Sequence, residues 1–299
     1  MRKLEKILKK SCTSRKLKKV IEQSIVKIRV RAGKAITNPK LRIEESLELY
    51  RIVAHLIGDG FAGKTHVPYY SNNCKELRYQ FKKDLQIFGK IPTYERKTKT
   101  VTCLMFPKPI SDILRHIFKI EFIRPTKLPK EIFSASDKCK GAFLQALFDD
   151  EGCISSNIVI AMNNFNLVNS IKNLTESLDI KTSKITKRKD HKFYYSFSVS
   201  EKDIISFKEK IGVIHPKKIK RLNYKLKIKE RNNITRTRPL NWTRSRILSL
   251  LKRGSMTTTE MSNKLLLTFP GIYHHLNYLK NSKKIIDYGY KNKKEWYLL

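Results

Sequence analysis

An apolar helical stretch that ends in an acid followed by glycine occurs twice in this chain, and no other feature restricts the possible fold as strongly. The first copy is residues 52–60, IVAHLIGDG, and the second is residues 144–152, LQALFDDEG. Their terminal acids, Asp59 and Glu151, are 92 residues apart. A carboxylate at a helix C-terminus is unfavourable against the helix dipole. Its presence in both copies therefore indicates a role beyond local structure.

Each copy begins a longer repeated pattern. An Asn that opens an amphipathic helix follows 14 and 13 residues after the acids (Asn73 and Asn164), and an Asp that opens another helix follows after 53 and 52 (Asp112 and Asp203). Strand-like runs at 100–106 and 193–199 lie between them. We therefore predict an α/β (α+β) fold with two tandem units, residues 44–134 and 135–225, each of order helix-strand-helix-strand-helix.

Both nine-residue stretches resemble the motif of LAGLIDADG homing endonucleases, and the resemblance covers about 180 residues including the landmarks. The resemblance implies a single-chain monomer with internal pseudo-two-fold symmetry and saddle-shaped antiparallel sheets. The same resemblance implies cleavage of double-stranded DNA as a step of intron mobility. It also implies that Asp59 and Glu151 are the catalytic metal ligands, with further metal contacts from the main-chain carbonyls of Gly58 and Asp150.

The residue types in the two motif helices are suited to close helix packing. Two helices approach closely only where small residues meet, and Ala54, Gly58 and Ala146 stand at such positions. Asp150 departs from this pattern, so we expect the last turn of its helix to flare away. Two neighbouring carboxylates repel unless a cation or protons lie between them. Their hard oxygens suit Mg²⁺, or Mn²⁺ in its place, whereas His55 is expected to be a packed or hydrogen-bonded residue.

The charge balance indicates a polyanionic partner. The chain has 64 Lys and Arg against 26 Asp and Glu, a net charge of +38. Double-stranded DNA is the natural partner, because each phosphate contact releases counterions, and an anionic membrane surface is the competing explanation. Lys or Arg interrupts every apolar stretch before the roughly 18 residues of a membrane span. On the strand-like segments we expect DNA contacts from Arg96, Lys187, Arg188, Lys189 and Lys192.

The two ends of the chain add further DNA-binding candidates. Residues 1–43 form a basic extension with a helix and an extended arm, either a solvated tail or a DNA-contacting arm, and residues 226–240 are expected to be a linker. Residues 241–299 resemble a winged helix-turn-helix with a third, recognition helix after Pro270. Its expected base-reading residues are Tyr273, His274 and Asn277, and its expected phosphate-binding residues on the wing are Lys291, Lys293 and Lys294.

Two alternatives to a DNA endonuclease remain open. One is a non-cleaving transcriptional regulator with the same fold fused to a helix-turn-helix, and the other is an RNA maturase. The presence of both motif acids favours cleavage over the first, and the winged helix argues against the second.

The five scattered cysteines contain no CxxC pair, which indicates reduced thiols in the cytoplasm, where the protein would associate with the nucleoid. An organellar location stays open. The initial Met and the lack of a C-terminal His-Asn junction indicate a free-standing protein rather than an intein.

Overall fold

The structure, a computed structural model, describes residues 25–29, 33–63, 66–189, 193–234, 241–289 and 294–299. Two compact units divide the chain. The first runs through Cys153 and continues over Asn157–Ile219, and the second comprises Ile154–Ser156 and Lys220–Leu299. None of the helices in the described residues combines the length and the apolar character of a membrane span. The expected helix before residue 25 lies outside the described residues.

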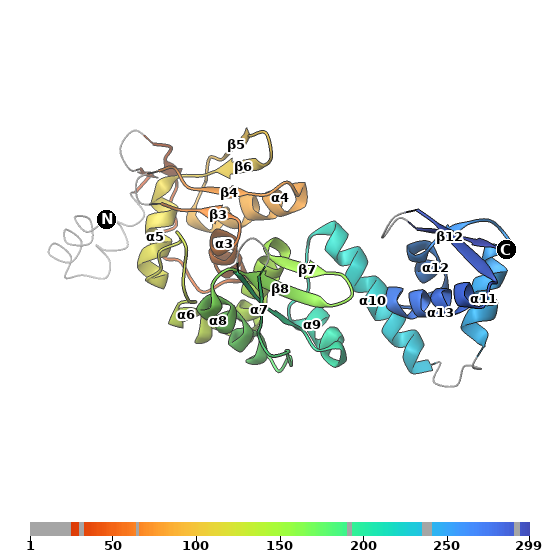
Figure 1. The fold of residues 1–299 in the computed structure, drawn as a ribbon. Helices are drawn as coiled ribbons and strands as arrows, with labels where there is room; N and C mark the ends of the chain where they lie inside the picture. Colours follow the sequence, from red (N-terminus) through yellow and green to blue (C-terminus); the bar gives the residue numbers. More distant parts are fainter. Residues whose placement is uncertain (1–24, 30–32, 64–65, 190–192, 235–240, 290–293) are drawn as a thin grey trace. The chain divides into compact units, whose positions relative to one another are not determined.

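The first repeat consists of a motif helix, a four-stranded sheet and two covering helices (Figure 1). Its elements are α3 (Leu47–Ile57), β3 (Gly60–Phe61), β4 (Tyr69–Ser71), α4 (Lys75–Asp84) with η1 (Leu85–Phe88), β5 (Tyr94–Lys97), β6 (Thr102–Met105) and α5 (Lys108–Phe118). The strand order is β3-β4-β6-β5, and every pairing is antiparallel.

The second repeat has the same plan. After α6 (Lys130–Phe133) come α7 (Asp137–Asp150), β7 (Gly152–Ile154), β8 (Ile158–Met162), α8 (Phe165–Glu176), β9 (Thr186–Lys189), β10 (Phe193–Ser198), η2 (Glu201–Asp203) and α9 (Ile204–Lys210). The strand order, β7-β8-β10-β9, matches that of the first repeat. The mixed helical and antiparallel fold is therefore as predicted. The expected strand-like runs 100–106 and 193–199 correspond to β6 and β10, and the strands β5 and β9, which carry the expected basic residues, pair with them.

The two motif helices pack along each other through small residues. Ala54 on α3 and Ala146 on α7 are both buried. Gly58, just after α3, lies so close to α7 that a Cβ there would stand 3.0 Å from the Cβ of Asp150. The expectation that α7 flares at this point is wrong, because α7 stays helical through Asp150 and the missing side chain of Gly58 provides the space.

Part of the basic extension packs on the first repeat. Strands β1 (Lys27–Ile28) and β2 (Ile36–Thr37) pair with each other, and Ile36 is buried. The amide of Thr37 donates to the carbonyl of Lys90 at 3.1 Å, and the amide of Lys90 donates back at 2.8 Å. The described part of the extension is thus anchored rather than a free tail.

Helix α10 (Pro216–Ile234) follows the second repeat and continues into the expected linker, whose residues 235–240 lie outside the described part. The second unit contains α11 (Trp242–Leu251), β11 (Met256–Thr257), α12 (Thr258–Leu265), α13 (Phe269–Asn281), β12 (Ile285–Tyr288) and β13 (Glu295–Leu298). Three helices over the three-stranded sheet β11-β13-β12 make a winged helix-turn-helix. Helix α13 begins at Phe269, so Pro270 lies in its first turn, where proline costs no hydrogen bond.

The core of this domain gathers apolar residues from its helices and its sheet. Ile272, Leu276 and Leu279 are buried along one face of α13, against Ile247 and Trp296. The indole N–H of Trp296 donates to the hydroxyl of Thr258 at 2.9 Å, so its one polar atom is satisfied.

Candidate active site

The two motif acids lie at one site at the C-terminal ends of α3 and α7. Burial, followed by the charges of Asp150 and Glu151, raises the pKa of Asp59 to about 7. Burial and the charge of Asp150 likewise raise the pKa of Glu151. The charge of Glu151 therefore acts on Asp59, and the charge of Asp150 acts on both acids, in a poorly solvated environment.

Asp150 is the structural centre of the site. Its side chain is fully buried, and its Oδ2 lies 2.8 Å from Nδ1 of His55. The hydroxyl of Tyr70 donates to its Oδ1 at 2.6 Å, and the amide of Asn72 approaches the same oxygen at 3.4 Å. Asn72 also donates to Oδ2 of Asp59 at 2.9 Å, which works against the rise of that pKa. Asp150 thus ties the second motif helix to the first repeat.

His55 is a packed, hydrogen-bonded residue, in agreement with its predicted structural role. It is buried, and its ring centroid lies 4.6 Å from that of Tyr70 and 5.6 Å from that of Phe81. Burial lowers its pKa, but the Asp150 carboxylate acts in the opposite direction and leaves the pKa raised. The pair therefore favours an imidazolium that balances one negative charge inside the helix interface.

A lysine that the sequence did not single out lies at the end of α7. Nζ of Lys218 donates to the carbonyls of Phe148 at 2.8 Å and Asp149 at 2.6 Å. Burial lowers its pKa, whereas Asp149, Asp150 and Asp59 act in the opposite direction. In the sequence Lys218 stands in a run of lysines along residues 213–240, and nothing there distinguishes it from its neighbours.

Asp149 holds the start of α10 against α7. Its carboxylate accepts backbone N–H bonds from Ile214 at 2.8 Å and from His215 at 2.9 Å. Burial raises its pKa to about 6, and the two N–H bonds partly oppose this rise. Of the three consecutive acids 149–151, two therefore make internal hydrogen bonds, and Glu151 is the one that lines an open pocket, described below.

The donor set fits a hard divalent cation held mainly by water and substrate. Within the described residues, no three His, Cys, Asp or Glu side chains converge as metal ligands. Asp59 and Glu151 would supply two carboxylates, and the Gly58 and Asp150 carbonyls are the expected additional oxygens. Mg²⁺ typically binds one or two carboxylates and keeps several waters. The negative charge that helps to raise these pKa values is what such an ion would neutralise.

The expected DNA-contacting strand residues lie on exposed edge strands. Arg96 is on β5 beside Tyr94, and Lys187, Arg188 and Lys189 are on β9. Nζ of Lys187 lies 4.1 Å from the ring centroid of Phe193 on the neighbouring strand β10. Each sheet thus presents basic and aromatic side chains at one edge. Lys192 lies outside the described residues.

The expected reading residues of α13 differ in their surroundings. Tyr273 and His274 are exposed, and Tyr273 stacks on Phe269 with ring centroids 6.1 Å apart, whereas Asn277 is half-buried. On the wing, Nζ of Lys294 is 2.7 Å from Oδ2 of Asp287 and is already paired. Lys291 and Lys293 lie outside the described part of the chain.

Comparisons with known proteins agree with this architecture. Residues 138–212 match the family model described as LAGLIDADG-like domain, and residues 241–282 match the one described as bacterial regulatory protein, arsR family. No curated protein gives a significant match.

Several solved structures contain chains that are similar to this one. A structure of mesophilic variants of the homing endonuclease I-DmoI is 16% identical, with a TM-score of 0.42, and covers 55% of this chain and 97% of its own. I-DmoI in complex with DNA and Ca is 15% identical, with a TM-score of 0.45, and covers 60% and 100%. Full-length DUF199/WhiA from Thermatoga maritima is 17% identical, with a TM-score of 0.40, and covers 84% and 96%.

The two family models match separate parts of the chain, and the helices and sheets of those parts are the ones described above. Residues 138–212 are therefore similar to a LAGLIDADG-like domain, and residues 241–282, in the C-terminal winged helix-turn-helix, are similar to a bacterial regulatory protein of the arsR family.

Proposed function

We propose that the chain is a site-specific, homing-type endonuclease that hydrolyses phosphodiesters in both strands of DNA, with Asp59 and Glu151 as the metal-binding carboxylates. One observation carries the proposal. The terminal acids of two motifs, 92 residues apart in sequence, share one site in which burial and the charge of Asp150 raise the pKa of each, and the charge of Glu151 adds to the rise at Asp59. Fixed acids of this kind are costly unless a cation or a proton joins them.

The chain's own residues have distinct tasks in this proposal. Asp59 and Glu151 hold the ion, and the carbonyls of Gly58 and Asp150 add oxygen ligands. The buried Asp150 and His55 pair fixes the relative position of the two helices, and Asn72 orients Asp59. A bound Mg²⁺ or Mn²⁺ would stabilise charge on the attacking and leaving oxygens of the phosphodiester.

Charge supports duplex DNA as the substrate. Arg96 on one sheet and Lys187, Arg188 and Lys189 on the other lie on exposed edges, with Lys192 close by in sequence. In the winged helix, Tyr273, His274 and Asn277 are proposed to read bases, and Lys291, Lys293 and Lys294 to bind phosphate. Because phosphate contacts release counterions, the logarithm of affinity should fall by roughly 0.9 per contact with the logarithm of salt.

The decisive experiment is cleavage of a duplex selected from a randomised library in Mg²⁺. Asp59→Asn and Glu151→Gln should abolish cleavage yet retain binding in Ca²⁺, since packing does not require their charge. Asp137→Asn is the matched control, because Asp137 is an exposed acid at the other end of α7, paired only with Lys140. A double variant of Asp59 and Glu151 that cuts at the wild-type rate would refute the assignment.

The second candidate is a non-cleaving transcriptional regulator. One observation favours it, the match of residues 241–282 to the arsR family model. On this hypothesis no divalent metal yields cut ends with the wild-type protein, and removing residues 241–299 abolishes nearly all specific binding. Cleavage by the wild-type protein would exclude it.

A further inference from the structure

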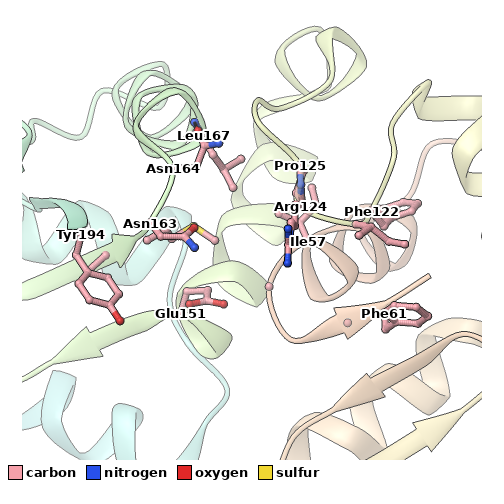
Figure 2. A pocket seen from close by; sticks show the side chains of 15 residues that line it. Ile57, Phe61, Phe122, Arg124, Pro125, Glu151, Asn163, Asn164, Leu167 and Tyr194 are labelled. Atoms are coloured by element: carbon pink, nitrogen blue, oxygen red, sulfur yellow. Dashed lines mark hydrogen bonds between the residues drawn. The ribbon is translucent and has the colours of Figure 1, made fainter. Parts of the chain in front are cut away.

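An open pocket of about 690 Å³ lies beside Glu151 within the first unit. One wall comes from the end of α3 at Ile57 and Gly58, and another from the second repeat at Asn163 and Tyr194. The remaining wall is the connector between the two repeats, residues 122–125. Figure 2 shows the guanidinium of Arg124 reaching from this connector into the pocket, with Glu151 across from it.

Arg124 has an unusual backbone for its type. Its φ is +51°, in the left-handed region that side chains other than glycine rarely adopt. The following Pro125 further restricts its conformation. The buried Phe122 and the Arg115 guanidinium, which donates to the carbonyls of Ala62 and Gly63, hold the segments around the connector. Such conformations are strained and concentrate at ligand-binding positions.

The Arg124 guanidinium is also available for a ligand. Within the described part of the chain it makes no hydrogen bond, ion pair or ring contact, and the residue is exposed. The amide of Asn163, the ring of Tyr194 and the Glu151 carboxylate line the same pocket. A planar, permanently charged fork of donors suits a phosphate, to which it binds through two parallel hydrogen bonds.

The second repeat contains a similar segment at the position that corresponds to Arg124. Ile123-Arg124-Pro125 follows the last helix of the first repeat, and Ile214-His215-Pro216 follows the last helix of the second, 91 residues later. A basic residue therefore precedes proline at the same place in both. The two sites differ in charge, because the imidazole of His215 has a pKa lowered by burial and by Lys218, whereas arginine is always charged.

We propose that Arg124 binds a backbone phosphate of the DNA strand that is cut beside Glu151, and so forms a phosphate subsite that serves one strand only. The subsite rests on the proposed endonuclease function for its role, but its ligand, a phosphate group, can be tested without cleavage. During hydrolysis, the oxygen of water forms a new bond to phosphorus and gives up a proton, the bond to the leaving oxygen breaks, and that oxygen takes up a proton to become a hydroxyl. The phosphate stays on one of the two ends. Arg124 holds the oxygens of that group before and after the step.

The first test is the kinetics of each strand on a supercoiled plasmid that carries the selected target. Arg124→Ala should slow one strand by roughly 10- to 100-fold, the value of a charge-assisted hydrogen-bond pair, so that nicked plasmid accumulates. Arg124→Lys should restore part of the rate. The control is Lys127→Ala, because Lys127 is an exposed basic residue that follows the connector closely and does not line the pocket. Equal slowing of both strands, or no slowing, would overturn the proposal.

The second test measures phosphate binding at Arg124 independently of DNA cleavage. Inorganic phosphate is titrated into the full-length protein, and the Nε–H signal of Arg124, assigned through Arg124→Lys, is followed by NMR. A saturable shift that Lys127→Ala retains is expected. If phosphate shifts this signal and no DNA is cut, the endonuclease proposal fails and the phosphate site stands. If wild-type protein cuts DNA but phosphate leaves the signal unchanged, the subsite is wrong and the endonuclease proposal stands.

Discussion

Replacing Tyr70 by Phe tests the buried polar centre that joins the two repeats. Tyr70 is completely buried, and its hydroxyl donates to Oδ1 of Asp150 at 2.6 Å. The remaining approach to that oxygen, from Asn72, is long at 3.4 Å. Phe keeps the ring and its packing against His55 and Phe81, so the change removes one hydrogen bond to a buried carboxylate and little else.

Such a bond contributes about 2–3 kcal/mol, because the carboxylate oxygen loses its best donor and cannot reach water. In a unit of this size that corresponds to a fall in Tm of about 4–12 °C. The measurement is urea unfolding and thermal melting of the full chain. Tyr69→Phe is the matched control: the ring of Tyr69 stacks on Phe61 at 5.2 Å, and its hydroxyl makes no hydrogen bond within the described residues. Equal stability of the two variants would refute the central role of Asp150.

Three further perturbations have defined outcomes. Gly58→Ala places a Cβ 3.0 Å from that of Asp150 and should cost about 1–3 kcal/mol in urea unfolding; unchanged stability would mean that the helices are not tightly packed there. Because the pKa of Asp59 is raised to about 7 in the fold, metal-free stability should fall from about pH 4 to pH 7 and then level off. Ca²⁺ should therefore raise the Tm more at pH 8 than at pH 5, and Glu151→Gln should reduce this difference; equal gains at both pH values would contradict a carboxylate site. Trp296→Phe removes a buried indole N–H bond and should weaken protection of α13 amides in hydrogen exchange by about 1–3 kcal/mol, without altering α3.

Periodicity and repetition carried most of the fold prediction. The spacing of apolar residues on α8 and α13 and the duplicated motifs are properties of the chain itself, because a helix or a strand with one buried face repeats its side chains at fixed intervals. The repeated motif acids also predicted that Asp59 and Glu151 share a site. The strands β5 and β9 were predicted only through their basic residues, because edge strands with polar residues on both faces carry no such periodic signal.

Tertiary structure decided how the site is held together. Asp150 looked like an interruption of a small-residue pattern, yet the open space at Gly58 and the donors of His55 and Tyr70 make it the buried link between the repeats. Lys218 was one lysine in a long basic run, and Arg124 was an ordinary connector residue. Contacts between residues roughly 90 positions apart leave no periodic trace in a single sequence, so only the folded chain distinguishes these side chains from their exposed neighbours.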